Sequence, residues 1–230
     1  KSQNVFVSYF LVSMLNSCSS DSNSNNNANI PPANTATLSV NGAPVTLSTN
    51  LAQRSENTLA ILANASDGSF LEIDFDAFGN LTRVAYDDSE GNSFATFKHF
   101  SSNYFTFNLL SVDSANKTVA VSYSGKVYSD EEDLDSEFKT VSGSFNLSYI
   151  LQTPSITGLG LSCKIAGSDW HETTFWDNGW NSVDRKYISD DNNQIIMTFG
   201  SEDIPTGNYP FNNSSANKIQ LAKYDPATGE

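Results

Sequence analysis

The sequence is poor in the residues from which most reaction centres are built. It has two histidines and two cysteines among 230 residues. It also lacks the HExxH zinc motif, the GxSxG nucleophile elbow, the glycine-rich phosphate loop and the dinucleotide-binding fingerprint. These absences argue against the enzyme classes that such motifs define. We therefore expect a protein without catalytic residues, cofactor or bound metal.

Positive charge is also scarce. The chain has 12 Lys and Arg residues against 26 Asp and Glu residues, a net charge of −14. Lys1 and Asp21 are the only charged residues before Thr35, so the acidity belongs to the remainder of the chain. Nucleic acids and anionic membrane surfaces attract Lys and Arg, so neither is an expected partner.

Long apolar runs are absent except for a short one at the start, "VFVSYFLVSML" at Val5–Leu15. A membrane-spanning helix needs ~20 apolar residues, whereas the apolar part of a secretory signal has roughly 7–15. The run therefore predicts a signal peptide. Lys1 is the remaining trace of its basic region, and we expect the true start of the chain to precede Lys1.

The residues after this run resemble the lipobox of bacterial lipoproteins. "LNSC" places aliphatic Leu15 three residues before Cys18 and small Ser17 directly before it, although Asn16 departs from the usual small or aliphatic residue. The resemblance implies a signal peptide at 1–17, cleavage before Cys18 and acylation of Cys18. Two or more acyl chains anchor a protein stably in a membrane. The alternative is a Cys18–Cys163 disulfide inside an ordinary fold, which would remove the anchor.

A polar segment, Ser19–Asn34, separates Cys18 from the first expected strand. It has nothing to bury, so residues 18–34 are predicted to be a lipidated cysteine and a disordered tether. Sixteen flexible residues span about 20–24 Å. The single acid Asp21 leaves open which face of the membrane the protein occupies.

Short alternating apolar segments separated by turn-forming residues fill the rest of the chain. This pattern predicts an all-β protein of antiparallel β-sandwich units, immunoglobulin-like or similar, without helices. Thr58–Asn64 also reads as a strand. The clearest segments are Ala36–Val40, Phe70–Phe75, Ser93–Phe100, Tyr104–Leu110, Thr118–Tyr128 and Thr140–Ile150.

A shift of 125 residues superposes two parts of the sequence. "LSVNGAPV" then meets "CKIAGSDW", with Gly42 on Gly167 and Val45 on Trp170. The repeat predicts two tandem units, 35–153 and 154–230, divided near Pro154. The first unit has about 50 residues past Phe100 that lack a counterpart, so we expect the second unit to be incomplete, with an open sheet edge and an uncovered apolar face.

The sequence resembles an uncharacterised domain family of Bacteroidetes-type lipoproteins. The resemblance lies in the leader, the "NG" turn, the segment "GNYPF" and the closing segment "KTVSGSFNLSY". The resemblance implies an envelope lipoprotein with one or two small β-rich domains. It supplies no catalytic residues. The first unit departs from the family pattern because Val45 stands where the second unit has Trp170.

Few side chains are candidates for a binding site. All three tryptophans lie in "WHETTFWDNGW". Trp170 is predicted to pack in a core, whereas Trp176 and Trp180 flank a turn and are candidate ligand-binding residues. His99 is predicted to be a packed strand residue and Cys163 a buried, inert thiol.

Two acidic groups raise the question of a metal, and neither predicts one. Asp169, His171 and Glu172 are too few for a structural zinc site. The run "SDEEDLDSE" at 129–137 lacks the spacing of an EF-hand loop and is predicted to be a solvated hairpin loop.

The sequence thus predicts a cell-envelope lipoprotein, lipid-anchored at the bacterial outer membrane, with a non-catalytic binding or display role. Its expected partners are the membrane, through the lipid on Cys18, and a glycan or another envelope protein. One alternative is a glycan-binding accessory module that uses Trp176 and Trp180. A second is a hydrolase that cleaves carbohydrate with paired carboxylates.

Overall fold

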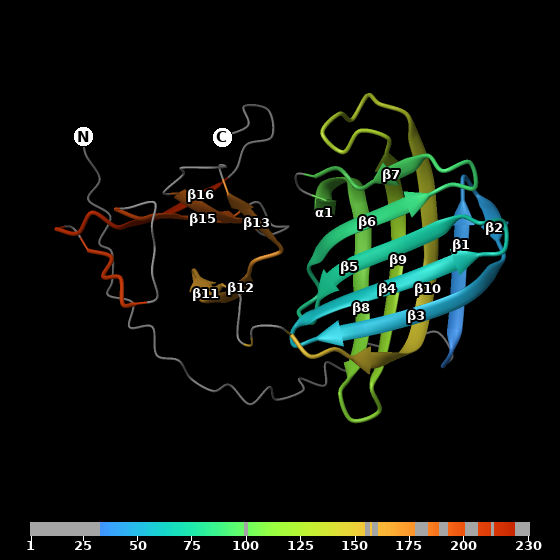
Figure 1. Ribbon diagram of the computed structural model, residues 1–230, viewed down its shortest axis with the longest axis horizontal. Helices are drawn as coiled ribbons and strands as arrows, with labels where there is room; N and C mark the ends of the chain where they lie inside the picture. Colours follow the sequence, from blue (N-terminus) through green and yellow to red (C-terminus); the bar gives the residue numbers. More distant parts are fainter. Residues whose placement is uncertain are drawn as a thin grey trace.

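The computed structural model shows an all-β chain (Figure 1). Its only helix is the single turn α1 (Ser101–Tyr104) among the residues that the structure describes. Side chains are not described at 101–102, 174–177 and 184–188. The described residues are 33–98, 101–154, 157, 161–177, 184–188, 193–200, 207–212 and 214–223.

Ten strands form one sheet that folds into two facing layers. One layer has the order β2-β1-β10-β9-β8 and the other the order β3-β4-β5-β6-β7. Figure 1 shows the second layer in front of β8, β9 and β10. The strands are β1 (Thr35–Val40), β2 (Ala43–Val45), β3 (Leu47–Ser55), β4 (Thr58–Ala65), β5 (Phe70–Asp76), β6 (Leu81–Asp87), β7 (Ser93–Ala95), β8 (Phe105–Asp113), β9 (Thr118–Tyr128) and β10 (Phe138–Leu151).

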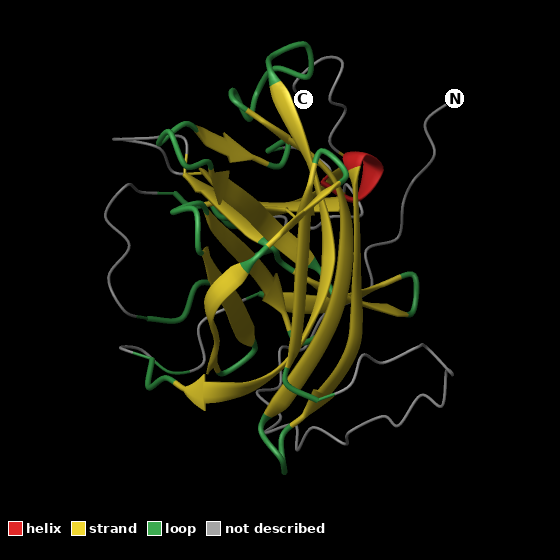
Figure 2. Cartoon of the chain, turned by 90° about the vertical axis from the view of Figure 1, so that its right-hand side faces the viewer, coloured by secondary structure: helices red, strands yellow, loops and turns green. Residues whose placement is uncertain are grey.

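The two layers are joined at two corners by long strands that change partners. β10 pairs with β1 through Val141–Asn146 and then, at 149–151, runs parallel to β3. β9 pairs with β8 along most of its length and reaches β7 through Tyr128 and Ala95. Figure 2, turned by 90° from Figure 1, shows that the long strands of the chain are curved. Long β9 and β10 therefore hold the sandwich together.

The core follows from strict alternation along the strands. In β5, Leu71, Ile73 and Phe75 are buried while the residues between them are partly exposed. Phe75 meets Phe107 of the opposite layer with ring centroids 5.0 Å apart. Alternating apolar residues on two inner faces are what two packed sheets require. The predicted all-β sandwich fold is confirmed.

One predicted strand is wrong in its extent. Ser93–Phe100 was expected to be a single strand, but β7 ends at Ala95 and α1 follows at Ser101. Thr96 lies beyond the strand, and its hydroxyl accepts a hydrogen bond from the backbone N–H of Val84. Four consecutive residues, 94–97, are buried, which a flat alternating strand does not allow. The chain therefore wraps around a corner of the core here.

Two hairpin turns with the sequence D-x-x-G-N use the same arrangement. The Asp76 carboxylate accepts hydrogen bonds from the backbone N–H and the side-chain amide of Asn80. Asp88 and Asn92 repeat these bonds in the next hairpin. Gly79 has a φ of 97°, which L side chains rarely adopt. Several of the acidic residues thus serve as turn caps.

The remaining strands form two small sheets. β11 (Ser162–Ile165) and β12 (Ser168–His171) make a hairpin. A four-stranded antiparallel sheet has the order β13-β14-β15-β16. Its strands are β13 (Thr174–Asp177), β14 (Asp184–Ile188), β15 (Asn193–Thr198) and β16 (Lys218–Lys223).

The β1–β2 and β11–β12 hairpins share both turn and register. Asn41 and Gly42 have φ angles of 51° and 79°, and Ala166 and Gly167 have 51° and 89°. Two successive positive φ angles are typical of a type I′ turn. Leu38 pairs with Val45, and Cys163 pairs with Trp170. Each residue of the second pair follows its counterpart in the first pair by 125 residues, the spacing of the sequence repeat.

Candidate functional site

Several of the predicted site residues lie outside the described residues. These are Cys18, His99 and Trp180. Trp176 belongs to β13, but only its backbone is described. The lipid-attachment site and the tryptophan pair therefore stay predictions.

Trp170 packs in the interior, as its position in the repeat predicts. Its side chain is 3% exposed. Opposite it in the hairpin, Cys163 carries a free thiol. Partial burial raises the pKa of Cys163, which lowers the thiolate fraction at neutral pH. Cys163 was predicted to be buried, but it is only partly buried in the hairpin, and its inertness stays a prediction.

His171 stacks on a ring from the first sandwich. Its imidazole lies parallel to the ring of Phe78, in the β5–β6 turn, with centroids 3.5 Å apart. Burial lowers the pKa of His171, and the nearby carboxylates of Asp76 and Asp169 oppose that shift. Burial likewise raises the pKa of Asp76, against hydrogen bonds donated mainly by Asn80. The contact favours a neutral imidazole that packs like an aromatic ring.

The acidic residues beside His171 have separate protein partners. Asp169 accepts a hydrogen bond from Lys164 Nζ at 2.6 Å. Glu172 accepts one from the backbone N–H of Leu161 at 3.0 Å. Within the described ranges, no group of three or more His, Cys, Asp or Glu side chains is placed to hold a metal ion.

The acidic run forms the hairpin loop between β9 and β10, as predicted. Two of its carboxylates fasten the loop to the opposite layer, because Glu131 lies 3.5 Å from Arg83 and Glu132 lies 2.7 Å from Lys98. Two more cap the loop itself: Asp130 and Asp133 accept backbone N–H bonds two residues further on. These four carboxylates therefore stabilise the loop and attach it to the opposite layer.

Next to this loop lies an aromatic cluster, defined here as Phe97, Tyr104, Tyr128 and Phe138. Phe97 meets Tyr104 edge-on at 5.3 Å, and Tyr128 meets Phe138 at 6.1 Å. Tyr104 and Phe138 are 37% and 43% exposed, and the Nζ of Lys126 sits 3.8 Å from the centre of the Phe138 ring. Aromatic residues such as Tyr and Phe are enriched in protein–protein interfaces relative to the rest of the surface. The sequence analysis missed this cluster, because its members come from α1, β9, β10 and the connection between β7 and α1.

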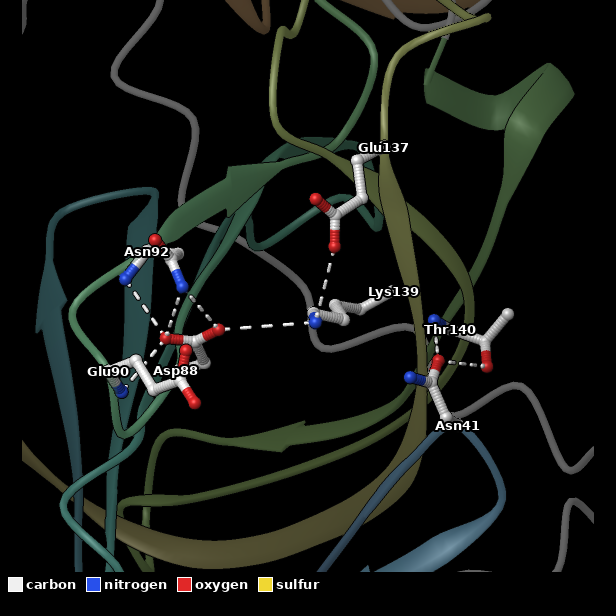
Figure 3. A network of polar contacts seen from close by, with 7 residues as sticks. All are labelled: Asn41, Asp88, Glu90, Asn92, Glu137, Lys139 and Thr140. Atoms are coloured by element: carbon white, nitrogen blue, oxygen red, sulfur yellow. Dashed lines mark hydrogen bonds and ion pairs between the residues drawn. The ribbon is translucent and has the colours of Figure 1, made fainter.

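A polar network closes the same end of the sandwich (Figure 3). Lys139 Nζ lies 3.5 Å from Glu137 and 4.0 Å from Asp88, and it faces the ring of Phe94. Figure 3 shows Asn41 and Thr140 beside it, where the Asn41 carboxamide oxygen accepts bonds from the Thr140 N–H and hydroxyl. This network ties the β1–β2 and β6–β7 turns to the start of β10.

One carboxyl group on the outer face of β5 has an unusual environment. Burial, and secondly repulsion from Glu72, raise the pKa of Asp74 to about 6, while Arg83 opposes the shift. Arg83 is the residue that pairs with Asp74 across β5 and β6, yet its nearest carboxylate is that of Glu131. Asp74 is therefore the group whose ionisation should affect stability near neutral pH.

Asp74→Asn is expected to raise the thermal unfolding midpoint at pH 8 and to change it little at pH 4. The native state favours the protonated carboxyl, so its stabilising contribution is full below 3.8 and is lost as the pH rises through about 6. Asparagine resembles the protonated form at every pH. Calorimetry at pH 4, 6 and 8 tests this, with exposed Glu90→Gln as the charge-matched control. An equal shift at pH 4 and pH 8 would contradict the assignment.

Comparison with known proteins gives no family for this chain. No protein-family model matches it, and no curated protein matches it. In the part of the chain that the structure describes, no helix is long and apolar enough to cross a membrane.

Proposed function

We propose that this chain is a lipid-anchored envelope protein of the bacterial outer membrane that displays a non-catalytic binding surface. The lipobox-like "LNSC" ending at Cys18 and the polar segment Ser19–Asn34 support an anchor and a tether. Strand β1 begins at Thr35, directly after that segment. The proposed tether therefore leads straight into the folded part.

The observation that supports the display role is the position of β1 relative to the aromatic cluster. Thr35 pairs with Asn146 of β10, whereas Phe138 begins the same strand. At ~3.4 Å per residue, these two points on β10 lie about 27 Å apart. The tether thus enters at one end of the sandwich, and the acidic loop with the aromatic cluster lies at the other. This arrangement places the cluster at the end of the sandwich opposite the proposed tether.

The packing of the sandwich also favours binding at an end surface. Side chains from both layers fill the space between the sheets, and residues such as Ile61 and Phe145 are 0% exposed. A partner would therefore contact the loops and strand ends of the sandwich. Tyr104 and Phe138, with the acidic loop beside them, present apolar area and negative charge together. We propose another envelope protein or a glycan as the partner of this surface.

Membrane partition tests the anchor. The full-length chain made in a bacterial host is expected to fractionate with membranes, and Cys18→Ala is expected to release it into the soluble fraction, because acyl chains supply the binding energy. Cys163→Ala is the matched control, since it also removes a cysteine. It should leave the protein in the membrane fraction. Equal partition of wild type and Cys18→Ala would contradict the anchor.

A further inference from the structure

A stacked pair of rings joins the first sandwich to the β11–β12 hairpin. Phe78 lies in the turn between β5 and β6, and His171 is the last residue of β12. Their rings are nearly parallel, at an angle of 6°, with centroids 3.5 Å apart. Among the described strands, β12 and the strands of the sandwich belong to separate sheets. Side chains rather than backbone pairing therefore make this contact.

The alternation of side chains along β12 explains why His171 is available for the contact. Neighbouring residues of a strand point to opposite faces. Trp170 is 3% exposed, whereas His171 is partly exposed and Asp169 is exposed. The hairpin therefore buries Trp170 on one face and presents His171 on the other. Phe78 stays 51% exposed with the imidazole against it, so the contact buries little area and can open without unfolding either sheet.

The charged groups around His171 leave its neutral form favoured. Burial lowers the pKa of the imidazole below its ordinary value of 6.5, and the carboxylates of Asp76 in β5 and Asp169 in β12 offset only part of this shift. Asp169 is itself paired with Lys164 Nζ of β11 at 2.6 Å. Burial raises the pKa of Asp76, so acid also removes the negative charge that would attract a protonated His171.

We propose that the Phe78–His171 stack is a pH-dependent contact that holds the β11–β12 hairpin to the first sandwich at neutral pH and weakens on acidification. A neutral imidazole packs on Phe78 as an aromatic ring does. A protonated one brings a charge that the contact partly removes from water. The contact is therefore at full strength above pH 6.5 and is lost as the pH falls through the lower pKa of the stacked imidazole. In this range its equilibrium constant should fall about tenfold per pH unit, for one proton.

The titration of His171 tests the proposal. The parent protein is the full chain with Cys18→Ala, which removes the proposed lipid. The chain has two histidines, so NMR of the ring protons resolves both, and His99→Gln assigns them. The midpoint of His171 is expected below 6.5 in the parent and closer to 6.5 in Phe78→Ala, because that variant removes the stacked ring. Phe138→Ala removes an exposed ring at another place and should leave the midpoint unchanged.

Nuclear Overhauser contacts between the two rings report the stack itself. In the parent they should be present at pH 7.5 and weaken by pH 5. His171→Phe has a ring that does not titrate, so its contacts with Phe78 should be equal at both pH values. An equal midpoint of His171 in the parent and in Phe78→Ala would overturn the proposal. So would a higher midpoint in the parent, which cation–π attraction would produce, or ring contacts in the parent that are as strong at pH 5 as at pH 7.5.

Discussion

Phe145→Ala is expected to lower the free energy of unfolding of the sandwich by about 3–5 kcal/mol. Phe145 is 0% exposed and lies in the middle of β10. Its ring stacks nearly parallel to that of Tyr123, with centroids 5.7 Å apart. Truncation removes the buried apolar surface and leaves a cavity between two layers that share β10. The loss should therefore appear as a single cooperative change in the unfolding of the sandwich.

Phe138→Ala is the matched control for this loss. It removes the same side chain from the same strand, but Phe138 is 43% exposed. Its effect on denaturant unfolding should stay below about 1 kcal/mol, the range for surface positions. The two variants should differ in midpoint with similar slopes. Equal midpoints would mean that β10 does not run through the core as described.

Gly143→Ala is expected to destabilise the sandwich by about 3 kcal/mol or more, the upper range for overpacking. A Cβ at this position would collide with the backbone oxygen of Thr37 and come within 2.7 Å of the Tyr123 hydroxyl. That hydroxyl donates a hydrogen bond to the same Thr37 oxygen at 3.1 Å. One methyl group therefore pushes β1 away from β10 and breaks a buried polar contact.

The control for the glycine variant is Ser148→Ala, an exposed position further along β10. It should change the unfolding midpoint little. Hydrogen exchange of the β1 amides gives a second reading, because Gly143→Ala should open β1 before the other strands. A Gly143→Ala protein as stable as the wild type would contradict the close approach of β1 to β10.

Much of the sandwich was predictable because its strands alternate strictly and its turns carry Asp, Asn and Gly at fixed positions. β9 matches the expected segment Thr118–Tyr128, and β10 contains the expected Thr140–Ile150. Strand β3, "LSTNLAQRS", escaped notice since its polar residues dominate and only Ala52 is fully buried. The strand predicted at Ser93–Phe100 failed because the chain bends where local alternation still looks regular.

The candidate site was less predictable than the fold. The sequence analysis chose Trp176 and Trp180 because they flank a turn, where two large rings are not easily buried together. The ring pairs that the structure forms, Phe97 with Tyr104 and Tyr128 with Phe138, join residues that are 7 and 10 positions apart in the sequence. The partners of the acidic loop, Arg83 and Lys98, lie far from it in sequence. Pairing of this kind depends on topology, which local pattern does not encode.

The measurement that tests the central claim most directly is the intact mass of the full-length protein purified from bacterial membranes. A lipid-anchored display protein should begin at Cys18, with the first seventeen residues removed and the mass of acyl chains added. Cys18→Ala should lack that addition. A chain that retains Lys1–Ser17 without acyl chains, or one whose Cys18 is disulfide-bonded to Cys163, would contradict the anchor and with it the proposed display role.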